Sequence, residues 1–396
     1  MHADPSTPGT WREVLAVFLR LGLTSFGGPI AHLSYFREEF VVRRRWLDEE
    51  AYANLVSLCQ FLPGPASSQV GIALGYRRAR LPGALAAWVG FTLPSALMMT
   101  VFALGLVRLG AAQAGWLVGL KVFAVAVVAH AVWGMARALC PDAARRGIAV
   151  AVAGILLVVP WPQAQLGAMV LAGIAGWLLL RALPPPARVA VQSSVPRGLA
   201  VGALSLFALL LVGLPVVAHA LQSDLLELFS VFYRAGALVF GGGHVVLPLL
   251  QTQVVPPGWV DDGTFLAGYA VAQAVPGPLF TFAAFLGAVI PLPGGVTGAI
   301  IALLGIFAPA FLLVIGALPF WHGALQLPAL RSASAGVNAG VVGVLLAALI
   351  TPVATSAIGS IADGLLALAA LAALVRSRMP VWAVALACAG TGALLH

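Results

Sequence analysis

The feature that most constrains the fold of this chain is a succession of thirteen apolar runs that extends along almost its whole length. Many of these runs approach the ~20 residues that a helix needs to cross the hydrocarbon core of a bilayer. Of the 396 residues, 61% are hydrophobic and only 9% are charged, far below the roughly 25% of a soluble domain. The pattern predicts an all-α polytopic membrane protein with runs at 14–36, 51–76, 83–108, 115–136, 147–160, 164–181, 198–221, 227–250, 264–290, 294–318, 332–351, 357–375 and 380–395.

Charged residues are distributed unevenly between these runs and the loops. Among the carboxylates, only Asp363 lies inside an apolar run, whereas three basic residues, Arg20, Lys121 and Arg234, do so. Cation transporters and proton relays usually keep a carboxylate at membrane depth. The polar stretch before the first run gives no sign of a cleavable signal peptide. The three cysteines have neither metal-ligand nor disulfide spacing, so no metal or cofactor is expected.

An internal repeat relates the two halves of the chain. VFLRLGLTSFGG at 17–28 aligns with VFYRAGALVFGG at 231–242, and QFLPGP at 60–65 aligns with QAVPGP at 273–278. Pro94 and Pro309 match further on, in the same order and at similar spacing. The sequence therefore divides into a first repeat at 1–181, a Pro-rich linker at 182–197 and a second repeat at 198–396, with an extra segment at 198–221 and the repeat core from 227.

The loops of the two repeats carry opposite charges. Arginines occupy 43–45, 77, 78 and 80 in the first repeat, whereas 251–263 in the second has no Lys or Arg and carries Asp261 and Asp262. Because basic loops stay in the cytoplasm, the two halves are expected to be inverted in the membrane. Both topologies considered place the N-terminus in the cytoplasm and the C-terminus in the periplasm. The charges favour re-entrant elements at 14–36, 51–76, 227–250 and 264–290, and broken spanning helices stay open as the alternative.

Glycine and proline interrupt several apolar runs at equivalent places. Proline ends one helix and suits the first turn of the next, so the P-G-P of 63–65 predicts a helix end near Leu62 and a new start near Ala66. GGP at 27–29 and GGG at 241–243 predict similar breaks. Broken backbone at membrane depth is tolerated only where protein buries it or where it lines a cavity. Each new helix start offers backbone N–H groups and a partial positive charge, which favour an anion.

Hydrogen-bond donors and positive charges surround the predicted breaks. An oxyanion offers only acceptors, so glutamine amides, hydroxyl groups in the first helical turns and the paired arginines fit an anion site. The candidate substrate-binding residues are Arg20, Thr24, Ser25, Gly27, Gly28, Gln60, Pro63, Gly64, Pro65, Ser67, Ser68, Lys121, Arg234, Gly241, Gly242, His244, Gln273, Pro276, Gly277, Pro278 and Thr281.

Structural explanations compete with this interpretation. The breaks could be packing kinks, and Arg20, Arg234 and Lys121 could extend to the membrane interface. His244, like His32, could be a core histidine with satisfied hydrogen bonds.

Together these motifs resemble the chromate ion transporter family, in its long form with two repeats. The resemblance rests on FLRLGLTSFGGP (18–29), WLDEE (46–50), QFLPGP (60–65), FGGG (240–243) and QAVPGP (273–278). It implies a bacterial inner-membrane protein that exports chromate, confers chromate resistance and meets sulfate as a look-alike. The second copy departs from the first where Leu238, Gly243 and Phe280 replace Thr24, Pro29 and Ser67, so the first repeat is expected to make more of the substrate contacts.

The predicted function is export of chromate by alternating access at a site between inverted repeats. A dianion that leaves a negative interior gains about twice 2.3 kcal/mol per 100 mV, so the membrane potential could drive export. A sulfate importer or exchanger and an anion channel are the alternatives. An enzyme is disfavoured because the sequence shows no nucleophile–base pair, metal cluster or nucleotide loop. The expected partners are a chromate- or sulfate-like oxyanion and the lipid bilayer, with no nucleic acid; a homodimer is the assembly considered.

Overall fold

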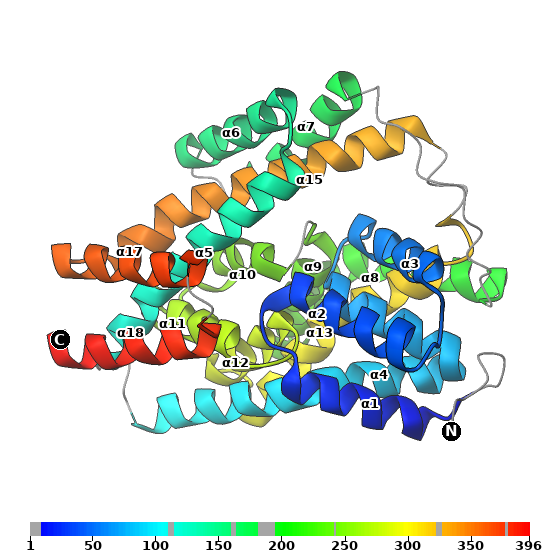
Figure 1. The fold of residues 1–396 in the computed structure, drawn as a ribbon, viewed down its shortest axis with the longest axis horizontal. Coiled ribbons are helices and arrows are strands. Elements are labelled where there is room, and N and C mark those ends of the chain that lie inside the picture. Colours follow the sequence, from blue (N-terminus) through cyan, green and yellow to red (C-terminus); the bar gives the residue numbers. More distant parts are fainter. Residues whose placement is uncertain are drawn as a thin grey trace. The chain divides into compact units, whose positions relative to one another are not determined.

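The computed structural model describes residues 9–109, 115–159, 164–180, 195–240, 243–321, 327–376 and 379–396 (Figure 1). Throughout these ranges the regular secondary structure is helical, which confirms the all-α prediction for this part of the chain. Five stretches within it are long and apolar enough to cross a membrane: Ala66–Arg108, Gly115–Leu139, Arg197–Leu221, Gly295–Ala317 and Pro328–Ala357.

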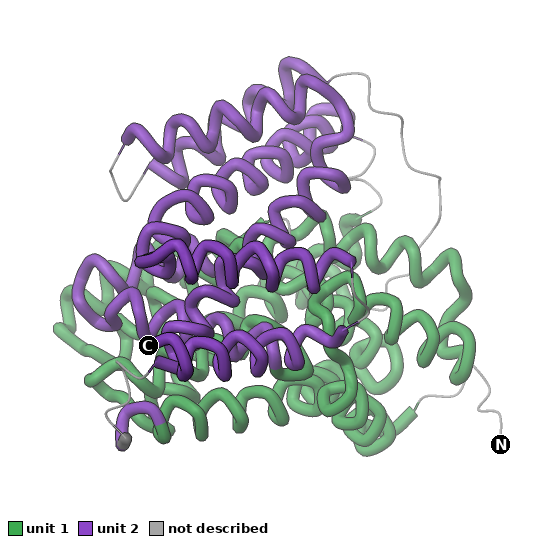
Figure 2. Tube along the Cα trace, turned by 60° about the vertical axis from the view of Figure 1, so that its left-hand side comes forward, with its two compact units in different colours: residues 1–105, 188–246, 275–322 green, residues 106–187, 247–274, 323–396 purple. Residues whose placement is uncertain are grey.

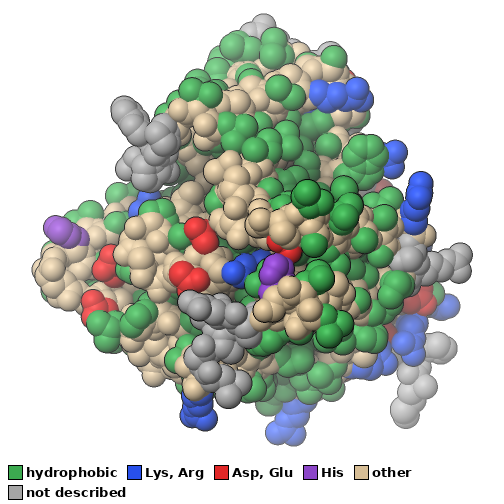
Figure 3. Space-filling view, turned by 90° about the vertical axis from the view of Figure 1, so that its left-hand side faces the viewer, with side chains coloured by type: hydrophobic (Ala, Val, Ile, Leu, Met, Phe, Trp, Pro, Cys, Tyr) green, Lys and Arg blue, Asp and Glu red, His purple; other side chains and the backbone are tan. Residues whose placement is uncertain are grey.

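Apolar side chains remain exposed on these helices, as expected of surfaces that face lipid. In α8 (Arg197–Leu221), Leu209 is 67% exposed and Val212 is 71% exposed. On the face drawn in Figure 3, hydrophobic side chains cover much of the surface, and Lys, Arg, Asp and Glu side chains are few. Contiguous apolar surface on this scale would be unfavourable in water. The chain is a multi-pass membrane protein.

The first repeat contains helices broken at the predicted places. Its longest helix, α4, leaves helical geometry at Ala79 and Arg80, where φ is −146° and +56°. Two arms therefore replace one continuous span, in agreement with separate apolar runs that end at 76 and begin at 83. The elements are α1 (Trp11–Thr24), α2 (Gly28–Arg37), the π-helix η1 (Glu38–Arg43), α3 (Glu49–Phe61), α4 (Ala66–Leu109), α5 (Gly115–Leu139), α6 (Ala143–Val158) and α7 (Ala164–Leu179).

The second repeat follows the same order after the extra helix α8. In the predicted linker, residues 182–194 lie outside the described residues, and Arg197 begins α8. The following elements are α9 (Asp224–Leu238), η3 (Gly243–Val245), α10 (Val246–Val254), α11 (Asp262–Ala274), η4 (Leu279–Thr281), α12 (Phe282–Val289), α13 (Gly295–Ala317), α15 (Pro328–Ala348), η5 (Leu349–Ala354), α16 (Thr355–Ala357), α17 (Ile361–Arg376) and α18 (Val381–Leu395).

The chain forms two compact units that cut across the two repeats (Figure 2). Unit 1 contains 1–105, 188–246 and 275–322, and unit 2 contains 106–187, 247–274 and 323–396. Each unit thus combines parts of both repeats, although 247–274 belongs to unit 2 while its counterpart in the first repeat belongs to unit 1. Sequence repeats and compact units differ because the two repeats contact each other within each unit. In unit 2 their helices pack together, and in unit 1 backbone hydrogen bonds join them.

In unit 1, glycines let equivalent helix pairs approach closely in both repeats. A Cβ on Gly22 of α1 would lie 2.6 Å from the carbonyl oxygen of Gly90 in α4. At the equivalent place, a Cβ on Gly236 of α9 would lie 2.1 Å from the carbonyl oxygen of Ile306 in α13. Real side chains cannot approach backbone so closely, so both helix pairs depend on glycine for the same contact. The repeat found in the sequence is therefore also a repeat in packing.

In unit 2, helices are exchanged between the repeats. Helix α15 of the second repeat packs against α6 and α7, and α5 of the first repeat packs against α17 and α18. The close approaches again use glycines, with Gly336 against Gly176 in one pair and Gly119 against Gly392 in the other. This reciprocal packing explains why neither repeat forms a compact unit by itself.

Candidate functional site

The first predicted break is formed by two glycines in left-handed backbone conformations. Helix α1 ends at Thr24, and Ser25 is extended. Gly27 and Gly28 have φ of +101° and +77°, which side-chain-bearing residues rarely adopt, and α2 begins at Gly28 with Pro29 in its first turn. Thr24 Oγ1 donates back to the carbonyl oxygen of Arg20 at 2.8 Å, so its hydroxyl is already used within α1.

The second predicted break lies at the first P-G-P and is also confirmed. Helix α3 ends at Phe61, and α4 begins at Ala66. Gly64 has φ of +122°, and a Cβ there would lie 2.8 Å from Nε2 of Gln69. That amide donates to the carbonyl oxygen of Pro63 at 2.7 Å, and the backbone N–H of Gln69 donates to that of Pro65 at 2.9 Å. The motif therefore forms a turn that Gln69 closes.

The second repeat reproduces both breaks with different side chains. Helix α11 ends at Ala274, Pro276, Gly277 and Pro278 are buried, and Gly277 has φ of +96°. Thr281 follows in η4, where its hydroxyl donates to the carbonyl oxygen of Pro278 at 2.9 Å. The candidates Gly241 and Gly242 lie outside the described residues.

The breaks of the two repeats are joined in unit 1 by exchanged backbone hydrogen bonds. The N–H of Gly64 donates to the carbonyl oxygen of Val239 at 2.6 Å, and the N–H of Gly277 donates to that of Ser25 at 2.9 Å. Ser25 and Val239 are equivalent in the repeat alignment, as are Gly64 and Gly277. Each P-G-P turn thus binds the helix end of the other repeat. Such reciprocity is the mark of a two-fold-related contact.

The remaining break segments also meet. Helices η3 and η4 are in contact, and Gly243 at the start of η3 lies beside Pro29 and Leu279. A Cβ on Gly28 would lie 4.0 Å from Nε2 of the half-buried His244. Thus all four breaks lie together in unit 1.

Buried polar groups gather around these breaks on the side of the first repeat. Ser67 Oγ lies 3.4 Å from Nδ1 of His32, which also hydrogen-bonds to the backbone of Ser25. In the described part of the chain, five buried atoms of this region have no hydrogen-bond partner. They are Ser25 Oγ, His32 Nε2, Ser68 Oγ, Gln69 Oε1 and Thr92 Oγ1. A buried polar group without a partner costs roughly 1–3 kcal/mol, so packing alone does not account for five of them.

The equivalent positions of the second repeat are mostly apolar. Val239, Val246, Phe282 and Phe307 stand opposite Ser25, His32, Gln69 and Thr92. The hydroxyl of Thr281, opposite Ser68, is satisfied by the carbonyl of Pro278. The polar cluster is therefore one-sided, although the backbone that carries it is repeated.

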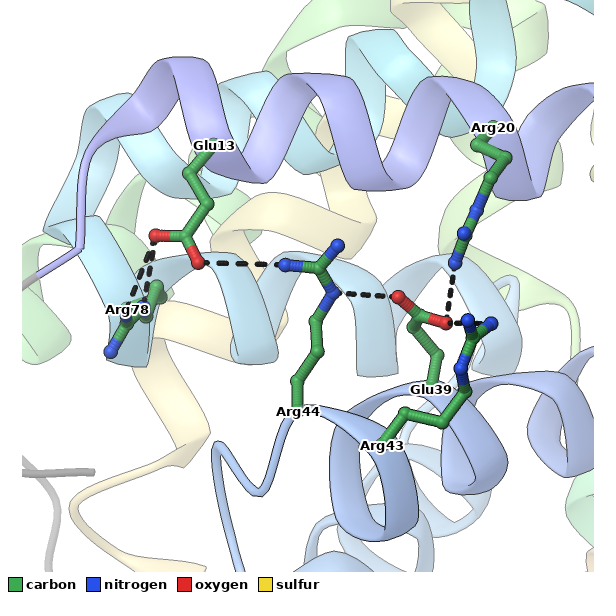
Figure 4. A network of polar contacts seen from close by, with 6 residues as sticks. All are labelled: Glu13, Arg20, Glu39, Arg43, Arg44 and Arg78. Atoms are coloured by element: carbon green, nitrogen blue, oxygen red, sulfur yellow. Dashed lines mark hydrogen bonds and ion pairs between the residues drawn. The ribbon is translucent and has the colours of Figure 1, made fainter. Parts of the chain in front are cut away.

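The paired arginines have different surroundings. Arg20 lies at the exposed side of α1, with 47% of its side chain accessible, and its Nη2 is 2.5 Å from Oε2 of Glu39 (Figure 4). Its equivalent, Arg234 of α9, is half-buried. Arg20 is therefore neutralised by a carboxylate in this structure, which the sequence did not indicate.

Glu39, in the first turn of η1, is the centre of an ion network. Its side chain is 5% exposed and accepts from Arg44 Nε at 2.6 Å and from Arg43 Nη1 at 3.2 Å. Glu13 extends the network, because it pairs with Arg44 and with Arg78 of α4 (Figure 4). Burial raises the pKa of the Glu39 carboxyl, but the hydrogen bond from Arg44 and the charges of Arg20, Arg44 and Arg43 outweigh burial and lower it below its usual value.

Three further candidates make no described contact with the buried polar groups at the breaks. Gln60 is exposed at the end of α3. Gln273 belongs to unit 2 and hydrogen-bonds to the side chain of Tyr269. Lys121, also in unit 2, has its Nζ 2.9 Å from the point where a Cβ on Gly263 would stand, and Oδ1 of Asp261 lies 3.0 Å from the same point.

Unit 2 also contains a cavity of about 370 Å³ between α6, α7, α10, α11 and α15. None of the candidate residues lines it. Asp262 does, and its carboxylate accepts a hydrogen bond from Gln251 at 2.9 Å. A carboxylate in the wall disfavours an oxyanion, so the breaks of unit 1 are the better candidate site. Within the described ranges, no group of three or more His, Cys, Asp and Glu side chains could hold a metal ion.

Sequence reasoning missed Gln69 and Thr92 and interpreted His32 as a core residue with satisfied hydrogen bonds. His32 is indeed buried, but its Nε2 has no partner among the described residues. One signal could have revealed Gln69, since it is an amide inside the apolar run 51–76, opposite a phenylalanine in the second repeat. Whether a buried polar atom lacks a hydrogen-bond partner depends on tertiary contacts, which no local sequence pattern shows.

Comparisons with known proteins agree with the internal repeat. A family model described as "Chromate transporter" matches residues 12–177 and again residues 226–393. A "Chromate transport protein" of Pseudomonas aeruginosa is 31% identical over 346 residues, which cover 85% of this chain and 80% of that protein. A "Chromate transport protein" of Cupriavidus metallidurans is 29% identical over 386 residues, which cover 95% of this chain and 90% of that protein. No solved structure matches the chain.

Proposed function

This chain belongs to the chromate transporter family, in the long form with two repeats, and on that premise we propose that it exports chromate. The proposed substrate site is the place in unit 1 where the helix breaks of the two repeats are joined by hydrogen bonds. The family is one of transporters rather than enzymes. The observation that carries the proposal is the exchange of hydrogen bonds between Gly64 and Val239 and between Gly277 and Ser25, beside buried hydroxyl groups without partners.

The chemistry of this region suits an oxyanion. Helices α2 and α4 begin at the breaks, so each directs the positive end of its dipole and its first N–H groups toward them. Ser67 and Ser68 lie in the first turn of α4 and add hydroxyl donors. A transporter site formed by broken helices between repeats follows the general design of secondary transporters.

We further propose that the two arginines act at different stages of transport. Glu39 already neutralises Arg20, so an oxyanion that reaches Arg20 must replace that carboxylate. Competition of this kind would let substrate release η1 from α1 and open the site on one side. Arg234, which is half-buried on α9, would serve the equivalent step of the second repeat.

Alternating access and direction are also part of the proposal. Inverted repeats with arginine-rich loops in the cytoplasm place the N-terminus inside and the C-terminus in the periplasm of a bacterial inner membrane. In that orientation the membrane potential favours exit of an anion, by about 2.3 kcal/mol per charge per 100 mV. One chain suffices for these steps, and a homodimer would carry two such sites.

Uptake of radiolabelled chromate into inside-out vesicles tests this function. We expect saturable uptake that sulfate inhibits and that a potential positive inside the vesicle accelerates. Arg20→Ala and Arg234→Ala should each abolish uptake while Arg12→Ala, at the exposed start of α1, leaves it unchanged. Uptake that fails to saturate would show a channel, and cells made more sensitive to chromate by the protein would show an importer.

A further inference from the structure

The side-chain amide of Gln69 is held in one orientation. Its Nε2 donates to the carbonyl oxygen of Pro63 at 2.7 Å, and a carbonyl can only accept, so the amide cannot be flipped. Gly64 makes this possible, since a Cβ there would lie 2.8 Å from the same nitrogen. Oε1 of Gln69 is consequently directed away from the turn, as a fixed hydrogen-bond acceptor.

This acceptor is fully buried and has no partner in the described part of the chain. The neighbouring Oγ of Ser68 is likewise buried without a partner. The second repeat offers nothing equivalent at this position, because Phe282 replaces Gln69. The repeated backbone thus carries an amide acceptor in the first repeat, beside hydroxyl and N–H donors, and a phenylalanine at the equivalent position of the second.

A fully deprotonated oxyanion does not fit this arrangement well. All its oxygens are acceptors, and an amide oxygen beside them would repel the charge without forming a bond. A singly protonated oxyanion carries one O–H donor and several acceptors, which matches Gln69 Oε1 together with the hydroxyl and helix N-terminal donors. Hydrogen chromate keeps its proton up to near-neutral pH, whereas hydrogen sulfate loses its proton already in strong acid.

We propose that Gln69 Oε1 accepts a hydrogen bond from the O–H group of hydrogen chromate, so that the site selects this monoanion over sulfate. This inference rests on the proposed function and names the substrate form that the same site takes. Each chromate then leaves with one negative charge rather than two.

Several titratable groups lie on the elements around Gln69 and must be separated from the substrate's own titration. His32 of α2 contacts Ser67, Arg20 of α1 pairs with Glu39, and Arg234 and Tyr233 lie on α9. The hydroxyl of Tyr233 donates to the carbonyl oxygen of Phe207 and is directed toward α8. Protonation of any of these groups would alter binding of all oxyanions together, and sulfate therefore serves as the internal control.

The test measures the Michaelis constant for total chromate and the inhibition constant of sulfate in the same proteoliposomes at several pH values. Above the pKa of hydrogen chromate, we expect the chromate constant to rise about tenfold per pH unit while the sulfate constant stays level. Complete lack of inhibition by sulfate also supports the proposal, since the unprotonated anion is then excluded. A chromate constant that stays level, or that changes in parallel with sulfate, would overturn it.

A charge count provides a second measurement on the unmodified protein. Simultaneous recording of radiotracer flux and membrane current should give one charge per chromate, and two charges per chromate would contradict the monoanion. Absence of chromate transport at every pH would instead refute the proposed function itself.

Gln69→Met tests the residue, with Gln253→Met on α10 as the matched control. Gln69→Met should lose at least tenfold in preference for chromate over sulfate at neutral pH, and Gln253→Met should retain it. A Gln69→Met protein that folds, transports and keeps the wild-type preference would exclude Gln69 as the acceptor. Where that variant fails to fold, the pH series and the charge count on the unmodified protein decide the question.

Discussion

The backbone N–H of Gly277 donates to the carbonyl oxygen of Ser25 at 2.9 Å, and this bond joins the P-G-P turn of the second repeat to the end of α1 in the first. Its counterpart runs from Gly64 to Val239 at 2.6 Å. Because each bond needs a glycine with positive φ, the two turns can approach the opposite helix ends only through residues without a side chain. The P-G-P motif thus occurs in both repeats because each copy contacts the helix end of the other repeat.

We predict that Gly277→Ala disrupts the hydrogen bond between the second P-G-P turn and the end of α1. A Cβ there would lie 2.7 Å from Oγ of Ser95 and 3.2 Å from the carbonyl oxygen of Phe91, in addition to about 1–2 kcal/mol of left-handed backbone strain. Transport should be lost, and the melting temperature in detergent should fall. Gly258→Ala is the control, because φ is +78° there but no atom lies within 4 Å of the new Cβ. Gly258→Ala should show the effect of backbone strain alone and keep transport. Equal effects of the two substitutions would contradict a role for the contact between the Gly277 turn and Ser25.

We predict opposite effects on stability and transport for Ser25→Ala. Its hydroxyl is buried without a partner in the described residues, so removal should leave the melting temperature unchanged or raise it. Chromate uptake should fall at least tenfold if the hydroxyl binds substrate. The buried Ser332 provides the contrast, since its Oγ donates to the carbonyl oxygen of Leu180 at 2.7 Å. Ser332→Ala should cost about 1 kcal/mol of stability and retain uptake; unchanged uptake by Ser25→Ala would remove Ser25 from the site.

We predict that Glu39→Gln loosens the attachment of η1 to α1. Three arginines lose their common carboxylate, and the expected cost is between about 1 and 3 kcal/mol, because the arginines are partly exposed and can turn toward water. Glu49→Gln, which removes an ion pair with Arg37 in which both side chains are exposed, should have no measurable effect. Melting temperatures in detergent compare the two variants, and equal stability of both would show that the network contributes little.

The lowered pKa of Glu39 predicts the pH dependence of this contribution. A carboxyl whose pKa is lower in the folded protein stabilises it at pH values above its unfolded pKa and ceases to do so as the pH falls through the folded pKa. The difference in melting temperature between wild type and Glu39→Gln should therefore be full at neutral pH and shrink below about pH 4. A difference that grows on acidification would reverse the assigned sign.

We predict that the loops of the two repeats are labelled from opposite sides of the membrane. Arg45→Cys, in the arginine-rich loop, should react with an impermeant maleimide only from the cytoplasm, and Pro257→Cys only from the periplasm. The native Cys59, Cys140 and Cys388 are free but buried, so background labelling should be low. Labelling of both loops from the same side would refute the inverted repeats.

Much of the fold could be predicted from local chemistry. Proline and glycine set the helix ends at Phe61 and Thr24 and the starts at Ala66 and Gly28, because their backbone preferences act within a few residues. The kink at Ala79 and Arg80 was visible only as a gap between apolar runs. The candidate site was predicted less completely, since Gln69 and Thr92 belong to it through contacts between distant segments.

By itself, the sequence determined that this protein crosses the membrane with helices, that its two halves repeat, and that both halves break at the same motifs. Apolar length, proline and glycine suffice for this, because each acts along a single helix. Only the tertiary structure decided that each P-G-P turn binds the helix end of the other repeat, that Glu39 neutralises Arg20 and that Gln69 keeps an unpaired acceptor. These outcomes depend on which distant groups meet when helices pack, and hydrogen-bond and charge partners are chosen at that stage.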